Sequence, residues 1–132
     1  MTGLDYHVIG LVPGAFDLDT VVDALAVEGY SAERLATSAG RSGFRVVAHG
    51  GWGVSAWLED DDEARELNAT LAAGPLPAGV SAEDVARRPG QLSIWSDDDD
   101  ELEYAHVFEE VIEFLQERFG ALLWDDRLGE WR

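Results

Sequence analysis

Apolar residues recur along the chain with the two periods of regular secondary structure. Residues 6–12, YHVIGLV, form a nearly unbroken apolar run that ends at Pro13-Gly14, a pattern typical of a buried strand. A helix through about residue 28 is predicted next, and its apolar face consists of Leu18, Val21, Val22 and Leu25. Asp17 or Asp19 is a candidate N-cap for this helix, and Gly29 stands where a helix C-cap belongs.

The rest of the chain is predicted to form six further strands and three further helices. Three short strands are predicted at 33–38, 44–49 and 53–59, followed by helices at 63–73 and 81–88, a strand at 91–96, a helix at about 99–119, and a hairpin of 121–125 with 129–132. Glycine-rich segments, GRSG and HGGWG, form the turns of the strand meander. This order predicts one α+β domain over residues 1–132, with helices packed on one face of a mostly antiparallel sheet in a two-layer sandwich.

One segment occurs twice: SAWLEDDDE at residues 55–63 returns as SIWSDDDDE at residues 93–101. Period two places the aliphatic residues of each copy on one sheet face and the Ser, Trp and acidic residues on the other. If helices cover the aliphatic face, Trp57 and Trp95 lie on the open face. Each indole is then either a half-buried packing residue or an anchor for a partner, and Trp52 in the HGGWG turn is a third candidate anchor.

The acidic block of each copy has two interpretations that the sequence leaves open, and a weak internal duplication of a strand-turn-helix unit is a third possibility. Asp60 with Glu63, and Asp98 with Glu101, have the spacing of a capping box. Capping accounts for one or two acids per block, so the others are either solvated or part of a binding patch on one flank of the fold. The candidate patch residues are Glu59, Asp60, Asp61, Asp62, Asp97, Asp98, Asp99 and Asp100.

The helix predicted at about 99–119 carries a further acidic stripe opposite its apolar face. The stripe consists of Glu103, His106, Glu110, Glu113 and Glu117. Like charges at these spacings destabilise a helix by ~0.2–0.5 kcal/mol per pair, so stability alone does not explain the stripe. Glu103 and Glu110 are therefore added to the candidate partner-binding residues. A divalent metal held by Glu103, His106 and Glu110 is an alternative that the residue types allow.

The net charge of the chain excludes some classes of binding partner and favours others. The chain has 27 acidic and nine basic residues, giving a net charge of −18, and all nine basic residues are arginine. Phosphates would be repelled, so neither nucleic acid nor an anionic membrane is a predicted partner, whereas a basic protein is. The first residues, MTGLDYHVIG, lack the features of a secretion signal, and no apolar run reaches the length of a membrane span, so a cytoplasmic location is expected.

No catalytic arrangement is predicted. The string GWGVSA at 51–56 is followed by a strand and not by a phosphate-binding helix, and HGGWG has no accompanying G-x-S-x-G nucleophile motif. His7 and His49 fall on predicted strands, where ordinary packing or rim positions are favoured. The absence of cysteine removes disulfides, thiolate catalysis and cysteine zinc sites. We therefore predict a binding protein without a cofactor, not an enzyme.

The small size, the acidic blocks SAWLEDDDE and SIWSDDDDE, and the segment LLWDDRLGEW together resemble the small acidic α+β immunity proteins of bacterial polymorphic-toxin systems. The resemblance covers the whole chain as a likeness of type and transfers no site to particular residues. It implies a tight, stoichiometric inhibitor of a basic toxin domain, often a nuclease.

Three alternatives to an immunity protein come from other classes. A housekeeping or ligand-binding domain of a salt-adapted cell would use its acid for solvation only and would spread it around the surface. A metal-dependent enzyme or cation sensor would use the Glu103, His106 and Glu110 stripe. A homodimer would bury the open sheet face of two copies against each other.

Overall fold

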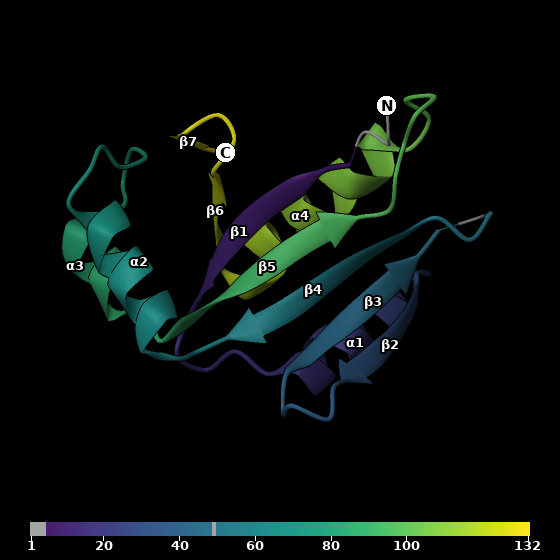
Figure 1. Ribbon diagram of the computed structural model, residues 1–132, viewed down its shortest axis with the longest axis horizontal. Helices are drawn as coiled ribbons and strands as arrows, with labels where there is room; N and C mark the ends of the chain where they lie inside the picture. Colours follow the sequence, from purple (N-terminus) through teal and green to yellow (C-terminus); the bar gives the residue numbers. More distant parts are fainter. Residues whose placement is uncertain (1–4, 49) are drawn as a thin grey trace.

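Seven strands form one antiparallel sheet in the computed structural model, which describes residues 5–48 and 50–132 (Figure 1). The strand order is β2-β3-β4-β5-β1-β6-β7. The strands are β1 (His7–Val12), β2 (Ser31–Ala36), β3 (Ser42–Val47), β4 (Gly53–Glu59), β5 (Gly90–Ser96), β6 (Leu122–Asp125) and β7 (Glu130–Trp131), and the helices are α1 (Leu18–Val27), α2 (Asp62–Ala72), α3 (Ala82–Arg87) and α4 (Ala105–Phe119). The predicted α+β class and the predicted order of elements are confirmed.

The main core lies between the sheet and the helices α1 and α4. Figure 1 shows α4 behind β1 and β5, and α1 behind β2 and β3. Leu25 of α1 and Leu115 of α4 are fully buried there, together with Phe44 of β3 and Ile94 of β5. These helices cover the face that period two predicts to be aliphatic.

The prediction that all helices pack on one face of the sheet is wrong for α2 and α3. These two helices pack on the opposite face, at one end of the sheet. Leu71 of α2 and Val85 of α3 form a second core cluster with Ile9 and Leu11 of β1. All six residues of β1 are buried, so this central strand is apolar on both faces and needs cover on both. The opposite face of β2 to β5, called the open face below, carries Ser55, Trp57, Ser93 and Trp95.

The longest helix begins later than the sequence predicts, at Ala105 and not near residue 99. The Asp99 carboxylate accepts the backbone N–H groups of Glu103 and Tyr104, at 2.8 and 3.0 Å, and so closes a loop at the point where a helix was expected. Leu102 adopts a left-handed conformation within this loop, with φ of 57°. The capping box predicted for Asp98 and Glu101 therefore does not form.

The other predicted helix boundaries agree with the structure within one or two residues. The side chain of Asp17 accepts the Thr20 N–H at the start of α1, and Gly120, with φ of 68°, ends α4. At α2 the cap is Asp61, which accepts the Ala64 N–H at 2.9 Å, and not the predicted Asp60. None of the helices in the described part of the chain has the length and apolar character that crossing a bilayer requires.

Candidate functional site

The two copies of the repeated segment pair with each other in the sheet. In the antiparallel register of β4 and β5, Trp57 lies opposite Ser93 and Ser55 lies opposite Trp95. Both indoles and both serines therefore occupy the open face, side by side on neighbouring strands, as the alternation predicts. The arrangement has an approximate local two-fold symmetry, because the same motif runs in opposite directions on adjacent strands.

The same pairing separates the acidic blocks, so the prediction that both lie on one flank is wrong. Glu59 lies opposite Gln91 at one end of the strand pair. At the other end, the Gly53 N–H donates to the Asp97 carboxylate at 2.9 Å. Because a strand rises about 3.3 Å per residue, the blocks begin roughly 20 Å apart. The two indoles lie between them.

Trp95 is the more accessible of the two indoles, with 40 % of its surface exposed. Its ring stacks on the buried imidazole of His7, with the centroids 3.8 Å apart. Its Nε1–H donates to Ser93 Oγ at 2.9 Å, and the Arg127 guanidinium lies 6.0 Å from the ring centroid. These contacts fix the orientation of the indole and leave part of its face in solvent.

Trp57 is half-buried on the neighbouring strand. The Arg41 guanidinium lies over its ring at 5.1 Å and also donates to Glu59 at 3.0 Å. Gly43 stands opposite Trp57 on β3, where a Cβ would come within 2.1 Å of the Ala56 carbonyl oxygen. The Trp57 ring also lies close to this position, 3.1 Å from where that Cβ would be, so the indole packs against Gly43 and leaves no room for a side chain there.

Asp97, the first acidic residue of the second block, forms hydrogen bonds with residues of the neighbouring strands. Arg45 on β3 donates to both oxygens of Asp97, at 3.2 and 2.7 Å, and to Ser55 Oγ at 3.0 Å. The Arg45 hydrogen bonds, together with the Gly53 N–H, hold the pKa of Asp97 below its ordinary value, although burial acts in the opposite direction. Asp97 thus links β3, β4 and the start of the loop.

Asp99 and Trp52, both predicted to contact a partner, are buried, which corrects their assignment to an accessible surface. Asp99 is 2 % exposed and accepts the Tyr6 hydroxyl at 2.7 Å in addition to its two backbone N–H groups. Trp52 is 6 % exposed, donates from Nε1 to the Asp98 carbonyl oxygen, and stacks on Tyr104 at 4.9 Å between centroids. Both residues hold the loop of residues 97–104 against the core.

The first acidic block is divided in the same way between structural and accessible carboxylates. Asp61 caps α2 and Asp62 pairs with Arg65, while Asp60 is exposed. A groove of about 570 Å³ runs beside this block, and it is lined by Glu59, Asp61, Glu63, Ala64, Glu66, Leu67, Thr70 and Gln91. Four of its eight lining residues are acidic, so this end of the open face has the stronger concentration of carboxylates around a hollow.

The stripe on α4 lies away from the indoles. Because α4 packs on the other face of the sheet, the exposed residues His106, Glu110, Glu113 and Glu117 point to the far side of the molecule. Glu103 belongs to the loop before α4, where a hydrogen bond with Glu101 and the charge of that neighbour raise its pKa. Within residues 5–48 and 50–132, no group of three or more His, Asp or Glu side chains is placed to hold a metal ion.

Every arginine of the chain forms an ion pair with an acidic residue of the chain. The pairs join Arg34 to Asp19, Arg41 to Glu59, Arg45 to Asp97, Arg65 to Asp62, Arg87 to Glu83, Arg88 to Asp84, Arg118 to Glu28, Arg127 to Asp5, and Arg132 to Glu109 and Asp125. Over the whole chain the net charge is still −18, because the acidic residues outnumber the arginines three to one. Further positive charge near the acidic residues has to come from solution or from a partner.

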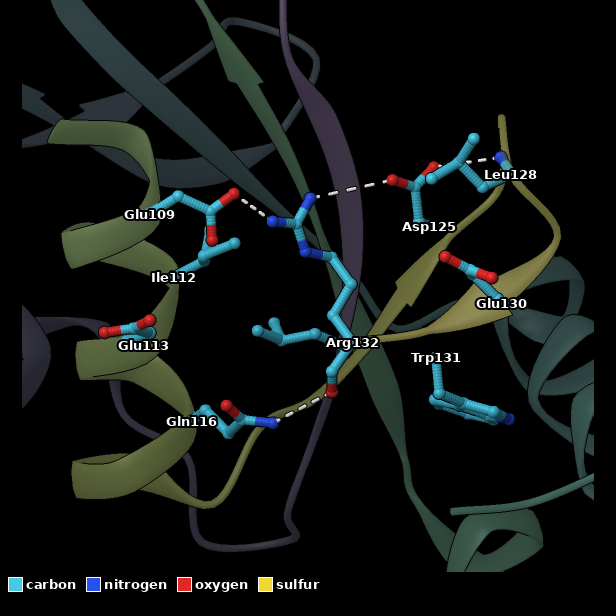
Figure 2. A pocket seen from close by; sticks show the side chains of 10 residues that line it. Glu109, Ile112, Glu113, Gln116, Asp125, Leu128, Glu130, Trp131 and Arg132 are labelled. Carbon is cyan, nitrogen blue, oxygen red and sulfur yellow. Dashed lines mark hydrogen bonds and ion pairs between the residues drawn. The ribbon is translucent and has the colours of Figure 1, made fainter. Parts of the chain in front are cut away.

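A second groove, of about 420 Å³, lies between α4 and the β6–β7 hairpin (Figure 2). The Arg132 side chain crosses it, pairing with Glu109 of α4 and with Asp125 of β6, and Gln116 donates to the Arg132 carbonyl oxygen. None of the predicted site residues lines this groove. The ion pairs of Arg132 hold the β6–β7 hairpin to α4. They also show how acidic side chains of this surface bind a guanidinium group.

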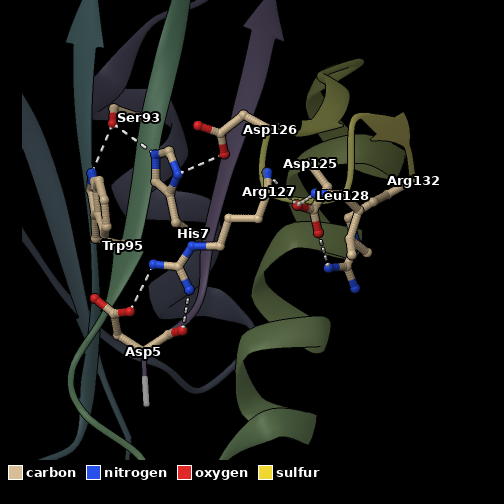
Figure 3. A network of polar contacts seen from close by, with 9 residues as sticks. All are labelled: Asp5, His7, Ser93, Trp95, Asp125, Asp126, Arg127, Leu128 and Arg132. Atoms are coloured by element: carbon tan, nitrogen blue, oxygen red, sulfur yellow. Dashed lines mark hydrogen bonds and ion pairs between the residues drawn. The ribbon is translucent and has the colours of Figure 1, made fainter. Parts of the chain in front are cut away.

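Two features of the surface were missed by reasoning from the sequence. Leu102 is 66 % exposed in its left-handed conformation, within the acidic loop of residues 97–104. A polar network joins His7 to Ser93 and to Asp126 of the β6–β7 turn (Figure 3). The network consists of residues from three segments that are far apart in the sequence, so no local motif predicts it. His7 lies on a strand as predicted and is buried there, and His49 lies outside the described residues.

The fold and this surface define a small acidic α+β domain with paired indoles on an open antiparallel sheet. No protein-family model matches the sequence, and neither a curated protein nor a solved structure does.

Proposed function

We propose that this protein is a binding module that docks a basic protein on its open face, as an immunity protein does when it neutralises a basic toxin domain. The observation that carries the proposal is the pair of indoles, Trp57 and Trp95, held side by side on an uncovered sheet and flanked by acid at both ends. Aromatic residues that become desolvated at the centre of an interface supply much of its binding free energy.

Charge complementarity defines the partner. Asp60 at one end and Asp98 at the other are exposed carboxylates, and the strand pair separates the two ends by roughly 20 Å. The partner that fits this surface presents cationic residues at two places with an apolar contact between them. Long-range attraction between the surfaces raises the association rate, and the indoles slow dissociation.

Affinity capture from the source organism at low and high salt tests this proposal. The wild-type chain is expected to retain a basic protein at low ionic strength and less of it at high ionic strength, because salt screens the attraction. The variant D60N/D98N, which removes one charge at each end, is expected to retain less than E113Q/E117Q, which removes two charges from α4.

Two outcomes would contradict the docking surface. Equal retention by the two charge variants would mean that net charge, and not the ends of β4 and β5, attracts the partner. A stable dimer of the purified chain in light scattering, lost on replacing Trp95, would make a second copy the occupant of the open face.

A second function is favoured by the distribution of acid that the structure shows. Exposed carboxylates occur at both ends of the sheet and along α4, on opposite sides of the molecule. That spread is expected of a domain from a salt-adapted cell, in which acid serves solvation. If this is correct, the melting midpoint rises steadily as KCl increases from 0.1 M to about 2 M, well beyond the range in which simple screening of surface charges saturates.

A control separates solvation from relief of charge repulsion. The variant E113Q/E117Q has two fewer charges on α4, so its midpoint at low salt is expected to rise if repulsion alone destabilises the fold. Thermal melting followed by circular dichroism measures both effects. A midpoint that does not change above 0.5 M KCl would exclude the salt-adapted function.

A further inference from the structure

Ser93, His7 and Asp126 form a chain of hydrogen bonds at the rim of the open face (Figure 3). The Ser93 Oγ lies 3.3 Å from His7 Nε2, and His7 Nδ1 lies 3.0 Å from the Asp126 carboxylate. The serine is half-buried, the imidazole is 8 % exposed, and the Asp126 side chain is 43 % exposed. The His7–Asp126 separation is that of a base and its orienting carboxylate, and the Ser93–His7 separation is slightly longer than the usual nucleophile–base distance, as is common without substrate.

The direction of the hydrogen bonds follows from the chemistry of the groups. An ionised carboxylate only accepts hydrogen bonds, so Asp126 places the proton of a neutral His7 on Nδ1. The other ring nitrogen, Nε2, is then an acceptor and faces the Ser93 hydroxyl. Trp95 donates its indole N–H to Ser93 Oγ at 2.9 Å, which leaves the hydroxyl proton of Ser93 for His7. All three contacts therefore favour removal of the proton from Ser93.

The repeated segment supplies an internal comparison. Ser55 occupies the position in the first copy that Ser93 occupies in the second, on the same face of the neighbouring strand. Its Oγ accepts a hydrogen bond from Arg45 Nη1 at 3.0 Å. A guanidinium has no acceptor and cannot take a proton, so Ser55 lacks the base that Ser93 has.

We propose that Ser93 is a nucleophile that accepts acyl groups from small neutral esters, with His7 as its base and Asp126 as the residue that positions His7. The substrate class follows from the surroundings. Trp57 lies directly opposite Ser93, and Trp95 is two residues along the strand on the same face, so an apolar acyl group has an indole on two sides. The net charge of −18 disfavours anionic esters.

The reaction consists of two balanced steps. As Ser93 Oγ bonds to the ester carbonyl carbon, its proton passes to His7 Nε2, and the same proton then leaves with the alcohol when the carbon–oxygen bond of the ester breaks. Water afterwards attacks the acyl-serine, with His7 accepting a proton from the water and returning it to Ser93. The products are an alcohol, a carboxylic acid and the original serine.

The acyl-serine is expected to accumulate. The Trp95 Nε1–H donates to Ser93 Oγ, the attacking atom, and so is already engaged and not free to donate to the ester carbonyl oxygen on which the oxyanion develops. Losing one donor from an oxyanion site typically lowers a rate by ~10²–10³-fold. Acylation of activated esters should therefore be measurable, while deacylation is slow and the protein is modified stoichiometrically.

The test uses the purified full chain with an alkyl fluorophosphonate and with p-nitrophenyl butyrate, followed by intact mass spectrometry and peptide mapping. We expect one adduct per chain, located on Ser93, that S93A lacks and S55A retains. The D126N variant is expected to label ~10²-fold more slowly, because it loses the contribution of a correctly oriented base. Its melting midpoint should stay close to that of the wild type because Asp126 is an exposed residue of the β6–β7 turn and its substitution removes no core contact.

Rescue separates positioning from a structural role. D126E keeps a carboxylate and is expected to recover part of the labelling rate that D126N loses. An unmodified Ser93 in the folded wild-type chain, or equal labelling of the wild type and D126N, would overturn the proposal. The proposal does not rest on partner binding, since labelling needs only the isolated chain, and its failure leaves the affinity-capture result unchanged.

Discussion

Replacing Asp99 with asparagine is expected to lower the melting midpoint of the protein by about 5–10 °C at pH 7. The carboxylate is buried and accepts three hydrogen bonds, from the Tyr6 hydroxyl and from the backbone N–H groups of Glu103 and Tyr104. The two backbone groups bond to different oxygens. In either orientation of an asparagine amide, one backbone N–H would face an NH₂ group and remain without an acceptor. Thermal melting by circular dichroism measures the loss.

The neighbouring position provides the matched control. Asp98 carries the same charge in the same run, but it is exposed, and its contact with Trp52 is made by its backbone carbonyl oxygen. D98N is therefore expected to change the midpoint by no more than 1–2 °C, roughly the effect of an ordinary surface substitution. If D98N and D99N melted alike, the assignment of Asp99 to the structure of the loop would be wrong.

The effect of D99N should depend on pH. Burial raises the pKa of Asp99, but the hydrogen bonds from Tyr6, Tyr104 and Glu103 outweigh it, so the folded-state pKa lies below the ordinary value. A carboxyl whose pKa is lower in the folded state stabilises the fold above its unfolded pKa, and this stabilisation disappears as pH falls through the folded pKa. The midpoint difference between wild type and D99N is thus expected to be complete at pH 7 and to shrink below about pH 4.

The loop of residues 97–104 also contacts a second titratable group, the phenol of Tyr6. Burial and the hydrogen bond to Asp99 raise the pKa of Tyr6 to about 12, so the phenol stays protonated and remains a donor at any pH at which the fold is studied. Asp99 and Tyr6 are 93 residues apart in the sequence. Their bond ties the residue just before β1 to the loop before α4, and this contact explains why an aspartate in an acidic run is conformationally fixed and not simply solvated.

The order of elements could be predicted from the sequence because local patterns determine it. Alternation over residues 53–59 and 91–96 predicted β4 and β5 and the face that carries Trp57 and Trp95. The start of α4 could not be predicted in this way. The sequence at 99–104 offers acids suited to a first helical turn, but the tertiary contacts of Asp99 favour a loop.

Which candidate site residues lie close together depends on how the strands pair. The alternation of apolar and polar residues along a strand shows its two faces but does not show its neighbours. An antiparallel neighbour relation between β4 and β5 brings the indoles together and sends the acidic blocks to opposite ends. Trp52 stands in a glycine-rich segment that suggested exposure, yet its indole is covered by Tyr104. Asp126 meets His7 across 119 residues through the β6–β7 turn, a contact that no local pattern contains.

The double variant W57A/W95A is expected to weaken binding of the basic partner by ~100-fold or more. Large aromatic residues at the centre of an interface typically cost at least ~2 kcal/mol each when truncated, and about 1.4 kcal/mol corresponds to a factor of ten in affinity. Most of the loss should appear in the dissociation rate, since the acidic ends that attract the partner remain. Surface plasmon resonance with the partner recovered by affinity capture measures both rates.

Two variants separate this effect from general loss of apolar surface or of charge. Val27, at the end of α1, is 84 % exposed on the helical side of the molecule, so V27A removes accessible apolar surface far from the open face and should bind as the wild type does. D60N/D98N should instead slow association and reduce its dependence on salt. The docking surface would be refuted if W57A/W95A stayed folded and kept wild-type dissociation, because the indoles would then contribute nothing to the complex. Loss of binding by V27A would move the interface to the α1 and α4 layer.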